Sequence, residues 1–259
     1  MNLTVLTGSM RTQMKQSFAR PMFRFCLLAN PVLNTILLYE MYRNAGEENF
    51  LAYVVLGAGL MGLWSCICFS SAGDINRERY SGTLALIFAA PASFPMIILG
   101  KILGNTILSL VTLLISLITA VALFRVPLIL GNPLLFLVAL FGAIMAFVVI
   151  SSVIACLLTL SRKTELYMNC IEIPIILLCG FVFPVTILPK TVQVISYALS
   201  PTYAVELLRM AVWGVDDSAA FWEKFGIMVG ITAIYAILAG LLYRRIDRRV
   251  RIAATLEVA

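Results

Sequence analysis

Long apolar runs alternate with short polar stretches along this chain, and most of the charge lies in the polar stretches. The runs cover about residues 22–39, 50–72, 96–124, 134–160, 167–188 and 225–243. Each is close to or beyond the ~20 residues that an α-helix needs to cross ~30 Å of hydrocarbon. The pattern predicts an all-α integral membrane protein with six transmembrane helices, folded as a single domain over residues 1–259.

Residues 3–20, before the first run, have a more polar pattern. Apolar residues recur every three or four positions, at Leu3, Leu6, Met10, Met14 and Phe18, with Arg11, Lys15 and Arg20 between them. This spacing predicts an amphipathic helix that lies on the membrane surface. A cleaved signal peptide is the alternative, but the segment is too polar for one and no A-x-A-like cleavage site follows it.

The fifth run contains residues that interrupt helices. Pro174, Gly180 and Pro184 lie within it, and Pro189 and Pro201 follow. A single straight helix is therefore not expected there. Residues 191–199 then place Val192, Ile195 and Leu199 on one helical face, which predicts a short helix that re-enters the outer leaflet. Because irregular backbone at membrane depth needs protein or a water-filled cavity around it, we expect this segment to cap a translocation path, with an ordinary external loop as the alternative.

The composition fits a lipid environment and argues against catalysis. Hydrophobic residues make up 61% of the chain and charged residues 12%, with a mean hydropathy of +1.00. Soluble domains carry roughly a quarter charged residues. Histidine, the commonest general base and metal ligand, is absent, and the six cysteines have no C-x-x-C spacing. We therefore expect no metal site and no catalytic residues in this chain, which also argues against an intramembrane enzyme.

The net charge of +6 could indicate nucleic acid, anionic lipid or membrane topology. The basic residues lie between apolar runs, which favours topology, with membrane lipids but no nucleic acid as partners. Six spans put both termini on one side, and that side carries most of the Lys and Arg, including Arg77, Arg162, Lys163 and five arginines between 244 and 251. The positive-inside rule then predicts a multi-pass protein of the cell membrane with cytoplasmic termini.

The stretch after the second run is rich in charge of both signs. It contains Asp74, Arg77, Glu78, Arg79 and Tyr80, followed by Ser81-Gly82-Thr83-Leu84 and, further on, Pro91. A short helix that ends or bends at Gly82 could dock in a groove on a soluble partner. The alternative is an ordinary solvated turn.

Two motifs give the chain a family resemblance. The first, Glu78, Gly82-Thr83-Leu84 and Pro91, resembles the pattern of type-2 ABC exporter permeases, which pair with a separate ATPase. The second, in its expected place before the last run, reads Gly180-Phe181-Val182-Phe183-Pro184, Leu188-Pro189, Ile195-Ser196-Tyr197 and Pro201-Thr202-Tyr203-Ala204. One departure is Ala85, where members of the family often have an acidic residue.

The resemblance implies roles for both motifs. The ATPase-coupling loop would comprise Asp74, Arg77, Glu78, Arg79, Tyr80, Gly82, Thr83 and Leu84. The external re-entrant gate would comprise Phe183, Pro184, Leu188, Pro189, Tyr197 and Pro201. The implied partners are ABC ATPase subunits and a second permease copy or paralogue, in a bacterial or archaeal cell membrane. ATP closes the ATPases on each other, and the loop transmits the movement to the bundle.

Nucleotide chemistry is not expected in this chain itself. The only Gly-Lys pair, Gly100-Lys101, is followed by Ile102 rather than by the Ser or Thr of a phosphate-binding loop. We expect no cofactor on this chain, with ATP and Mg bound by the partner ATPase. The apolar and aromatic wall suits a drug, lipid, peptide or lipid-linked glycan equally well, so the substrate stays open.

Glu172 is the only acidic residue well inside an apolar run. A carboxylate at that depth by default marks a transport pathway, a partner or a proton relay. Near the cytoplasmic end of its run, it could instead reach Arg162 or Lys163. An ion-coupled secondary transporter is the alternative function, but such proteins normally bury several ionisable groups, and Glu172 alone is thin support.

Overall fold

The computed structural model describes residues 2–43, 52–83, 87, 94–124, 131–159, 164–214 and 218–253. Within these residues the regular structure is helical and there is no strand, which confirms the all-α prediction. The helices are α1 (Asn2–Ala19), α2 (Pro21–Tyr42), α3 (Gly57–Tyr80), α5 (Phe94–Phe124), α6 (Pro133–Thr159), α7 (Thr164–Leu178), α8 (Lys190–Ala198), α9 (Ser200–Trp213) and α10 (Ser218–Ala253). A π-helical turn, η1 (Ala52–Leu56), leads into α3, and a 3-10 turn, η2 (Val185–Ile187), precedes α8.

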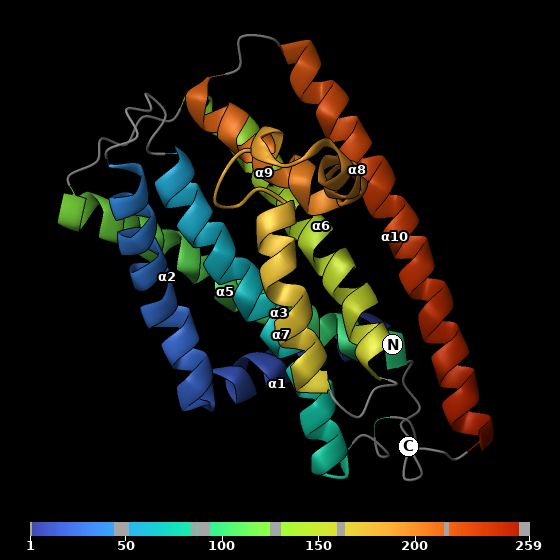
Figure 1. The fold of residues 1–259 in the computed structure, drawn as a ribbon. Helices are drawn as coiled ribbons and strands as arrows, with labels where there is room; N and C mark the ends of the chain where they lie inside the picture. Colours follow the sequence, from blue (N-terminus) through green and yellow to red (C-terminus); the bar gives the residue numbers. More distant parts are fainter. Residues whose placement is uncertain are drawn as a thin grey trace.

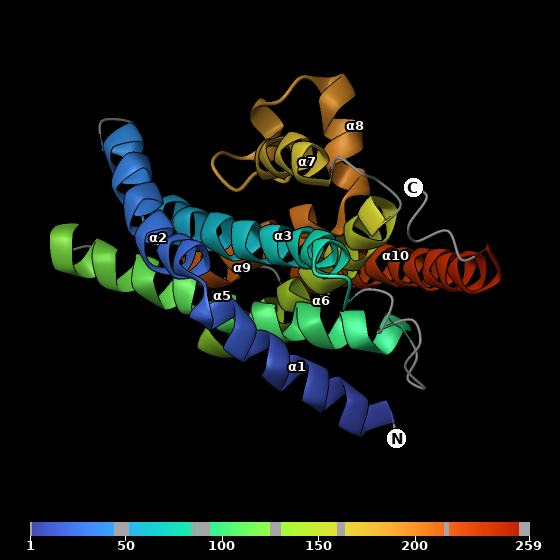
Figure 2. The same cartoon turned by 90° about the horizontal axis from the view of Figure 1, so that it is seen from below.

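Helix α3 lies at the centre of the bundle, where it packs against α2, α5, α6 and α7. Figure 2 shows α7 and α8 on one side of α3, with α5 and then α1 on the other. Helix α1, the C-terminal end of α3 and the C-terminal end of α10 lie toward the lower end of the molecule in Figure 1. The bundle therefore has two distinct ends, joined by α3.

Four of the described helices are long and apolar enough to cross a membrane. These candidate spans are Pro21–Tyr42, Pro95–Phe124, Pro133–Leu158 and Ser218–Ile246. Two shorter apolar helical stretches, Tyr53–Cys68 and Leu166–Leu178, fall in the second and fifth predicted spans. Length and composition thus identify fewer long spans in the described residues than the six apolar runs predict.

Helix α7 ends at Leu178, ten residues before the end of the fifth apolar run at 188. Gly180 takes a φ of +73°, and the Phe181 N–H donates to the Ile176 carbonyl at 3.2 Å. A left-handed glycine with this backward hydrogen bond is a common helix stop, because glycine has no Cβ to clash. As Gly180 and the prolines predict, no single helix covers this run.

Helix α1 forms where the sequence predicts it, and it turns a polar face toward the bundle. Gln13 and Ser17 are buried, whereas Leu3 is 74% and Phe18 is 54% exposed. Its backbone lies close to two glycines of α5: a Cβ at Gly100 would be 2.8 Å from the Leu6 carbonyl oxygen, and one at Gly104 would be 2.7 Å from that of Met10. This small-xxx-small pair lets the two helices approach closely.

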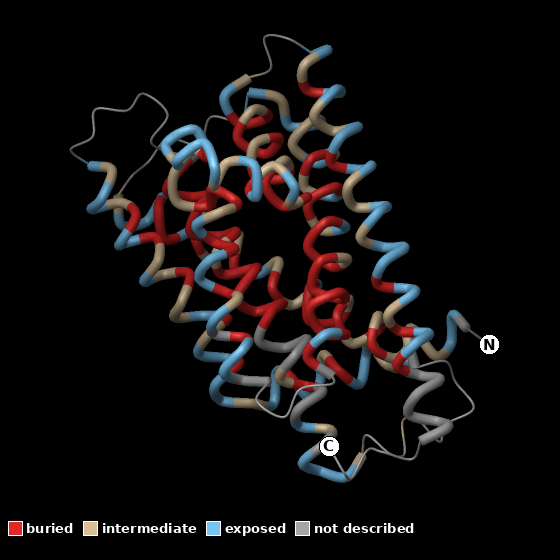
Figure 3. The backbone as a smooth tube through the Cα atoms, turned by 45° about the vertical axis from the view of Figure 1, so that its right-hand side comes forward, coloured by how far each residue is buried: buried red, intermediate tan, exposed pale blue. Residues whose placement is uncertain are grey.

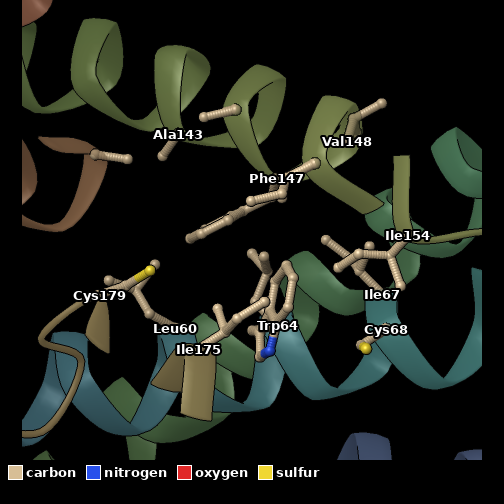
Figure 4. Packing of buried hydrophobic residues seen from close by; sticks show 14 of the residues in the cluster. Leu60, Trp64, Ile67, Cys68, Ala143, Phe147, Val148, Ile154, Ile175 and Cys179 are labelled. Carbon is tan, nitrogen blue, oxygen red and sulfur yellow. The ribbon is translucent and has the colours of Figure 1, made fainter. Parts of the chain in front are cut away.

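The core joins α3 to α6 and α7. Figure 4 shows Trp64 of α3 facing Phe147 of α6, with Ile175 of α7 beside it. The ring centroids of Trp64 and Phe147 are 6.0 Å apart, and the Phe147 ring meets Phe181 edge-on at 5.8 Å. In Figure 3 the buried residues gather on the inward faces of the central helices. This dense packing makes α3 a rigid connection between the two ends of the bundle.

Candidate coupling site and external segment

Asp74 lies near the C-terminal end of α3 and is only 4% exposed. Its Oδ1 accepts hydrogen bonds from Arg20 Nη1 and Arg77 Nη1, each at 2.8 Å. Its Oδ2 accepts from Gln13 Nε2 and, at 3.2 Å, from Asn105 Nδ2. One carboxylate thus receives donors from α1, the α1–α2 junction, α3 itself and α5.

The partners of Asp74 also bind one another. Ser17 Oγ donates to Asn105 Oδ1 at 2.6 Å, and Gln13 Nε2 donates to Ser17 Oγ at 2.8 Å. Burial of a carboxylate is costly unless it is paired and hydrogen-bonded, and both conditions are met here. We call Gln13, Ser17, Arg20, Asp74, Arg77 and Asn105 the Asp74 network.

Glu78, one turn further along α3, forms a second contact with α5. Its carboxylate accepts hydrogen bonds from Lys101 Nζ and from Thr83 Oγ1. Burial alone would raise the pKa of Glu78, but these hydrogen bonds and the positive charges of Lys101 and Arg77 outweigh it, so the pKa lies below its ordinary value. Glu78 is therefore held in its ionised form by this chain.

The rest of the predicted coupling loop is more open. Tyr80 is 80% exposed and the Arg77 side chain is 47% exposed. Helix α3 ends at Tyr80, and Gly82 follows with a φ of +70°, as expected for a residue that ends or bends a helix. Thr83 is half-buried against Glu78, and the side chain of Arg79, together with Leu84, lies outside the part that the structure describes.

Both acids of the predicted loop thus bind this chain, and among the loop side chains that the structure describes, those of Tyr80 and Arg77 face outward. Sequence reasoning missed Gln13 and Ser17 as partners of Asp74. The available signal was their spacing of four residues, which puts two uncharged polar groups on one face of α1.

At the other end of the bundle, residues 181–199 form a folded segment between α7 and α9, which we call the external segment after its predicted location. Pro184 and Pro189 precede η2 and α8, and Gln193 Nε2 donates to the Thr186 and Leu188 carbonyls at 3.1 and 2.7 Å. Phe183 and Leu188 are half-buried and Pro189 is exposed. The segment is therefore compact, with its backbone tied by a side chain of its own.

The second half of the external segment is tied to α9 and α10. Pro201 is buried in the first turn of α9, and the ring of Tyr197 lies 6.1 Å from that of Tyr203. Tyr235 of α10 donates to the Ala198 carbonyl at 3.1 Å. Ile195, expected on the apolar face of α8, is 56% exposed, so that face is only partly covered by this chain.

The sequence analysis did not single out Arg209, which lies beside the external segment. It is 4% exposed, its guanidinium lies 4.3 Å from the ring centre of Tyr53, and its Nη2 donates to the Phe181 carbonyl at 3.0 Å. The signal in the sequence was an arginine between apolar neighbours, Leu208 and Met210.

Glu172 of α7 faces α3, where it is 9% exposed and accepts a hydrogen bond from Ser65 Oγ. Arg162 and Lys163, its expected alternative partners, lie outside the described ranges. Among the residues that the structure describes, no three His, Cys, Asp or Glu side chains form a group that could hold a metal ion. Glu172 therefore stands as a single carboxylate with a hydroxyl partner.

Comparison with known proteins gives one informative result. No curated protein matches the chain. A family model described as ABC-2 type transporter matches residues 5–213, from α1 to the end of α9, and so includes both the α3 end and the external segment. Because the match covers well over half of the sequence, this multi-pass membrane chain belongs to the ABC-2 type transporter family, whose membrane domains are non-catalytic permease components.

Proposed function

We propose that this chain is the membrane-spanning subunit of an ABC exporter, driven by separate ATPase subunits. Two such subunits, identical copies or paralogues, would enclose the substrate path between them. The observation that carries the proposal is the anchored end of α3, which presents Tyr80 and Arg77 outward while Asp74 and Glu78 hold it from behind. The family as a whole implies an ATPase partner.

The proposed topology has six spans, with both termini in the cytoplasm. The four long apolar helices supply four of them, and the helices around Tyr53–Cys68 and Leu166–Leu178 supply the shorter second and fifth. Helix α1, the C-terminal end of α3 and the C-terminal end of α10 carry basic residues and lie toward the same end of the bundle (Figure 1), which supports a cytoplasmic assignment of that end. Reporter fusions at Ala259 and within residues 216–220 should give opposite signals, and equal signals would end the six-span proposal.

The anchored α3 end suggests how a movement of the ATPases reaches the bundle. Closure of two ATPase subunits around ATP and Mg displaces Tyr80 and Arg77. The Asp74 network and the Glu78–Lys101 ion pair transmit this displacement to α1, α2 and α5 together. This chain binds no cofactor in the proposed cycle, and it supplies the substrate path and the mechanical connection to the ATPases.

The external segment closes the opposite end of the path in this proposal. A lid at the boundary of the bundle, rather than a further span, fits three of its features: the prolines, the 3-10 turn and the partly uncovered face of α8. Glu172 could line the path on α7, but its bond to Ser65 equally suits interhelical adhesion. Membrane lipids would cover the remaining apolar surface.

The test of this proposal uses Tyr80→Ala, because the side chain of Tyr80 is 80% exposed. Tyrosine is enriched among the few interface residues whose truncation weakens binding by about 2 kcal/mol or more. We expect Tyr80→Ala to reduce both co-purification of the partner ATPase and substrate-stimulated ATP hydrolysis. The permease purified alone should hydrolyse no ATP.

Phe18→Ala is the matched control, since Phe18 is another exposed aromatic at the same end of the molecule. It should leave both measurements unchanged. If Tyr80→Ala and Arg77→Ala each bind and stimulate the ATPase like the wild type, the α3 end is not the docking site.

A further inference from the structure

Two consecutive backbone carbonyls at the start of the external segment are held by side chains from different helices. The Phe181 carbonyl accepts from Arg209 Nη2 of α9 at 3.0 Å. The Val182 carbonyl accepts from the Tyr42 hydroxyl of α2 at 2.6 Å. These donors come from residues 28 and 140 positions away in the sequence, so the contact is tertiary rather than part of the local turn.

The same aromatic group supports both donors. Tyr53, in the π-helical turn η1, lies under the Arg209 guanidinium at 4.3 Å from its ring centre. Its ring stacks on Tyr42 with centroids 5.5 Å apart, and it lies 5.8 Å from the ring of Trp213. A desolvated guanidinium over an aromatic face is attracted more strongly than an exposed one. Tyr53 thus links the two donors into one unit.

A close backbone approach completes the arrangement. A Cβ at Gly57, the first residue of α3, would lie 2.7 Å from the Phe181 carbonyl oxygen. Gly57 therefore leaves room for the carbonyl that Arg209 binds. The π-helical turn just before Gly57 shifts the register of the helix, and such turns often occur at functional sites. The start of the external segment is fixed from α2, η1, α3 and α9 at once.

We infer that Arg209 is a positioning residue that latches the external segment closed, together with Tyr42 and the ring of Tyr53. The latch consists of these three side chains and the carbonyls of Phe181 and Val182. Both bonds end on backbone carbonyls just beyond Gly180, whose φ of +73° already turns the chain away from α7. Release of the two donors would free the start of this segment without unfolding α7 or α9.

The latch rests on the proposed function in one respect. If the external segment is the lid of the transport path, opening toward the outside requires Arg209 and Tyr42 to give up the two carbonyls. An outward movement of α2 relative to α7 would break the Tyr42 bond, and an outward movement of α9 would break the Arg209 bond, since each donor sits on a helix other than the one that precedes the carbonyls. The latch then couples the closed lid to a closed bundle.

Hydrogen exchange of the purified permease tests the latch without any ATPase. The variants are Arg209→Met, Arg209→Lys and Tyr42→Phe, with Lys190→Met as control because Lys190 is exposed within the same segment. We expect Arg209→Met to speed exchange of the amides of residues 181–188 by about tenfold, from the loss of a charged hydrogen bond and a cation–π contact. Arg209→Lys keeps the charge and should restore much of the protection.

Tyr42→Phe removes only a hydroxyl and should speed the same exchange by a few-fold, which gives an answer even if Arg209→Met does not fold. Lys190→Met should match the wild type. Wild-type exchange in both Tyr42→Phe and folded Arg209→Met would overturn the latch. Faster exchange with unchanged transport and ATPase stimulation would leave the latch in place but refute the assignment of the segment as the lid.

Discussion

The two ends of α3 are held in place by different chemistry. At the C-terminal end, carboxylates of Asp74 and Glu78 bind basic and amide side chains of other helices. Near its N-terminal end, Arg209 and Tyr42 bind backbone carbonyls over an aromatic group. The first arrangement includes Glu78, whose ionised form is lost at low pH, whereas the second contains no acid among the described contacts.

This difference has a consequence for how each end responds to force and to mutation. A side-chain ion-pair network holds several helices together through a few charged atoms, so the loss of one atom group disturbs them all. A backbone carbonyl remains a hydrogen-bond acceptor whatever side chain its residue carries. The α3 end should therefore be sensitive at single positions, and the external segment only at its donors.

The largest effect is expected for Asp74→Ala. It leaves Arg20 and Arg77 without their shared carboxylate and removes one hydrogen-bond acceptor from Gln13 and one from Asn105. Removal of one partner from a fully buried ion pair costs about 3–5 kcal/mol, and the partial exposure of Arg20 and Arg77 puts the expected cost of Asp74→Ala below that range. We expect a clear fall in the unfolding temperature of the detergent-solubilised protein. Glu40→Ala is the control, since Glu40 is an exposed acid, and equal effects of the two variants would contradict a structural role for Asp74.

A smaller and pH-dependent effect is expected for Glu78→Gln. Because the pKa of Glu78 is lowered in the folded protein, its ionised form stabilises the fold at pH values above the ordinary pKa of about 4.3. This contribution is lost as the pH falls through the lowered pKa. The difference in unfolding temperature between wild type and Glu78→Gln should be full at pH 7 and shrink below about pH 4.3.

A pH-independent difference would show that the charge of Glu78 does not matter to stability. The charge swap Glu78→Lys with Lys101→Glu provides a second check, because it restores an ion pair of opposite polarity. We expect it to recover part of the stability that either single substitution loses.

The smallest effects are expected at two glycines that differ in their surroundings. A Cβ at Gly104 would press on the Met10 carbonyl at 2.7 Å, whereas one at Gly73 would meet nothing within 4 Å. Gly104→Ala should move α1 away from α5 and lower the unfolding temperature. Gly73→Ala should be neutral or stabilise α3 by up to about 1 kcal/mol, because alanine favours the helix. If both substitutions raised the unfolding temperature, the packing of α1 on α5 would not depend on the close approach at Gly104.

Sequence reasoning predicted the helices well because apolar runs have few alternatives in lipid. The long helices α5, α6 and α10 begin and end near or beyond the predicted runs. Gly180 also correctly predicted the break after α7. Local chemistry of this kind is readable from a few neighbouring residues, and so is the stop after Tyr80 at Gly82.

Partners distant in sequence could not be predicted in the same way. The pattern around Asp74 indicated a charged surface for a soluble partner, but its carboxylate is buried against residues 13, 20 and 105. Likewise, the pairing of Arg209 with the Phe181 carbonyl depends on how α9 packs beside η1. Such contacts follow from the packing of helices, about which a single sequence with no internal repeat gives little information.

Arg20 has one more consequence, because it is the single non-helical residue between α1 and α2. Its backbone is extended, with φ −83° and ψ 127°, and Pro21 follows at the first position of α2 and stiffens that side. The hydrogen bond from Arg20 to Asp74 therefore lies at the pivot about which α1 would rotate. A helix of 18 residues is about 27 Å long. A rotation of about 10° at Arg20 would sweep the far end of α1 by about 5 Å, so a small shift of α3 would be magnified at the amino terminus.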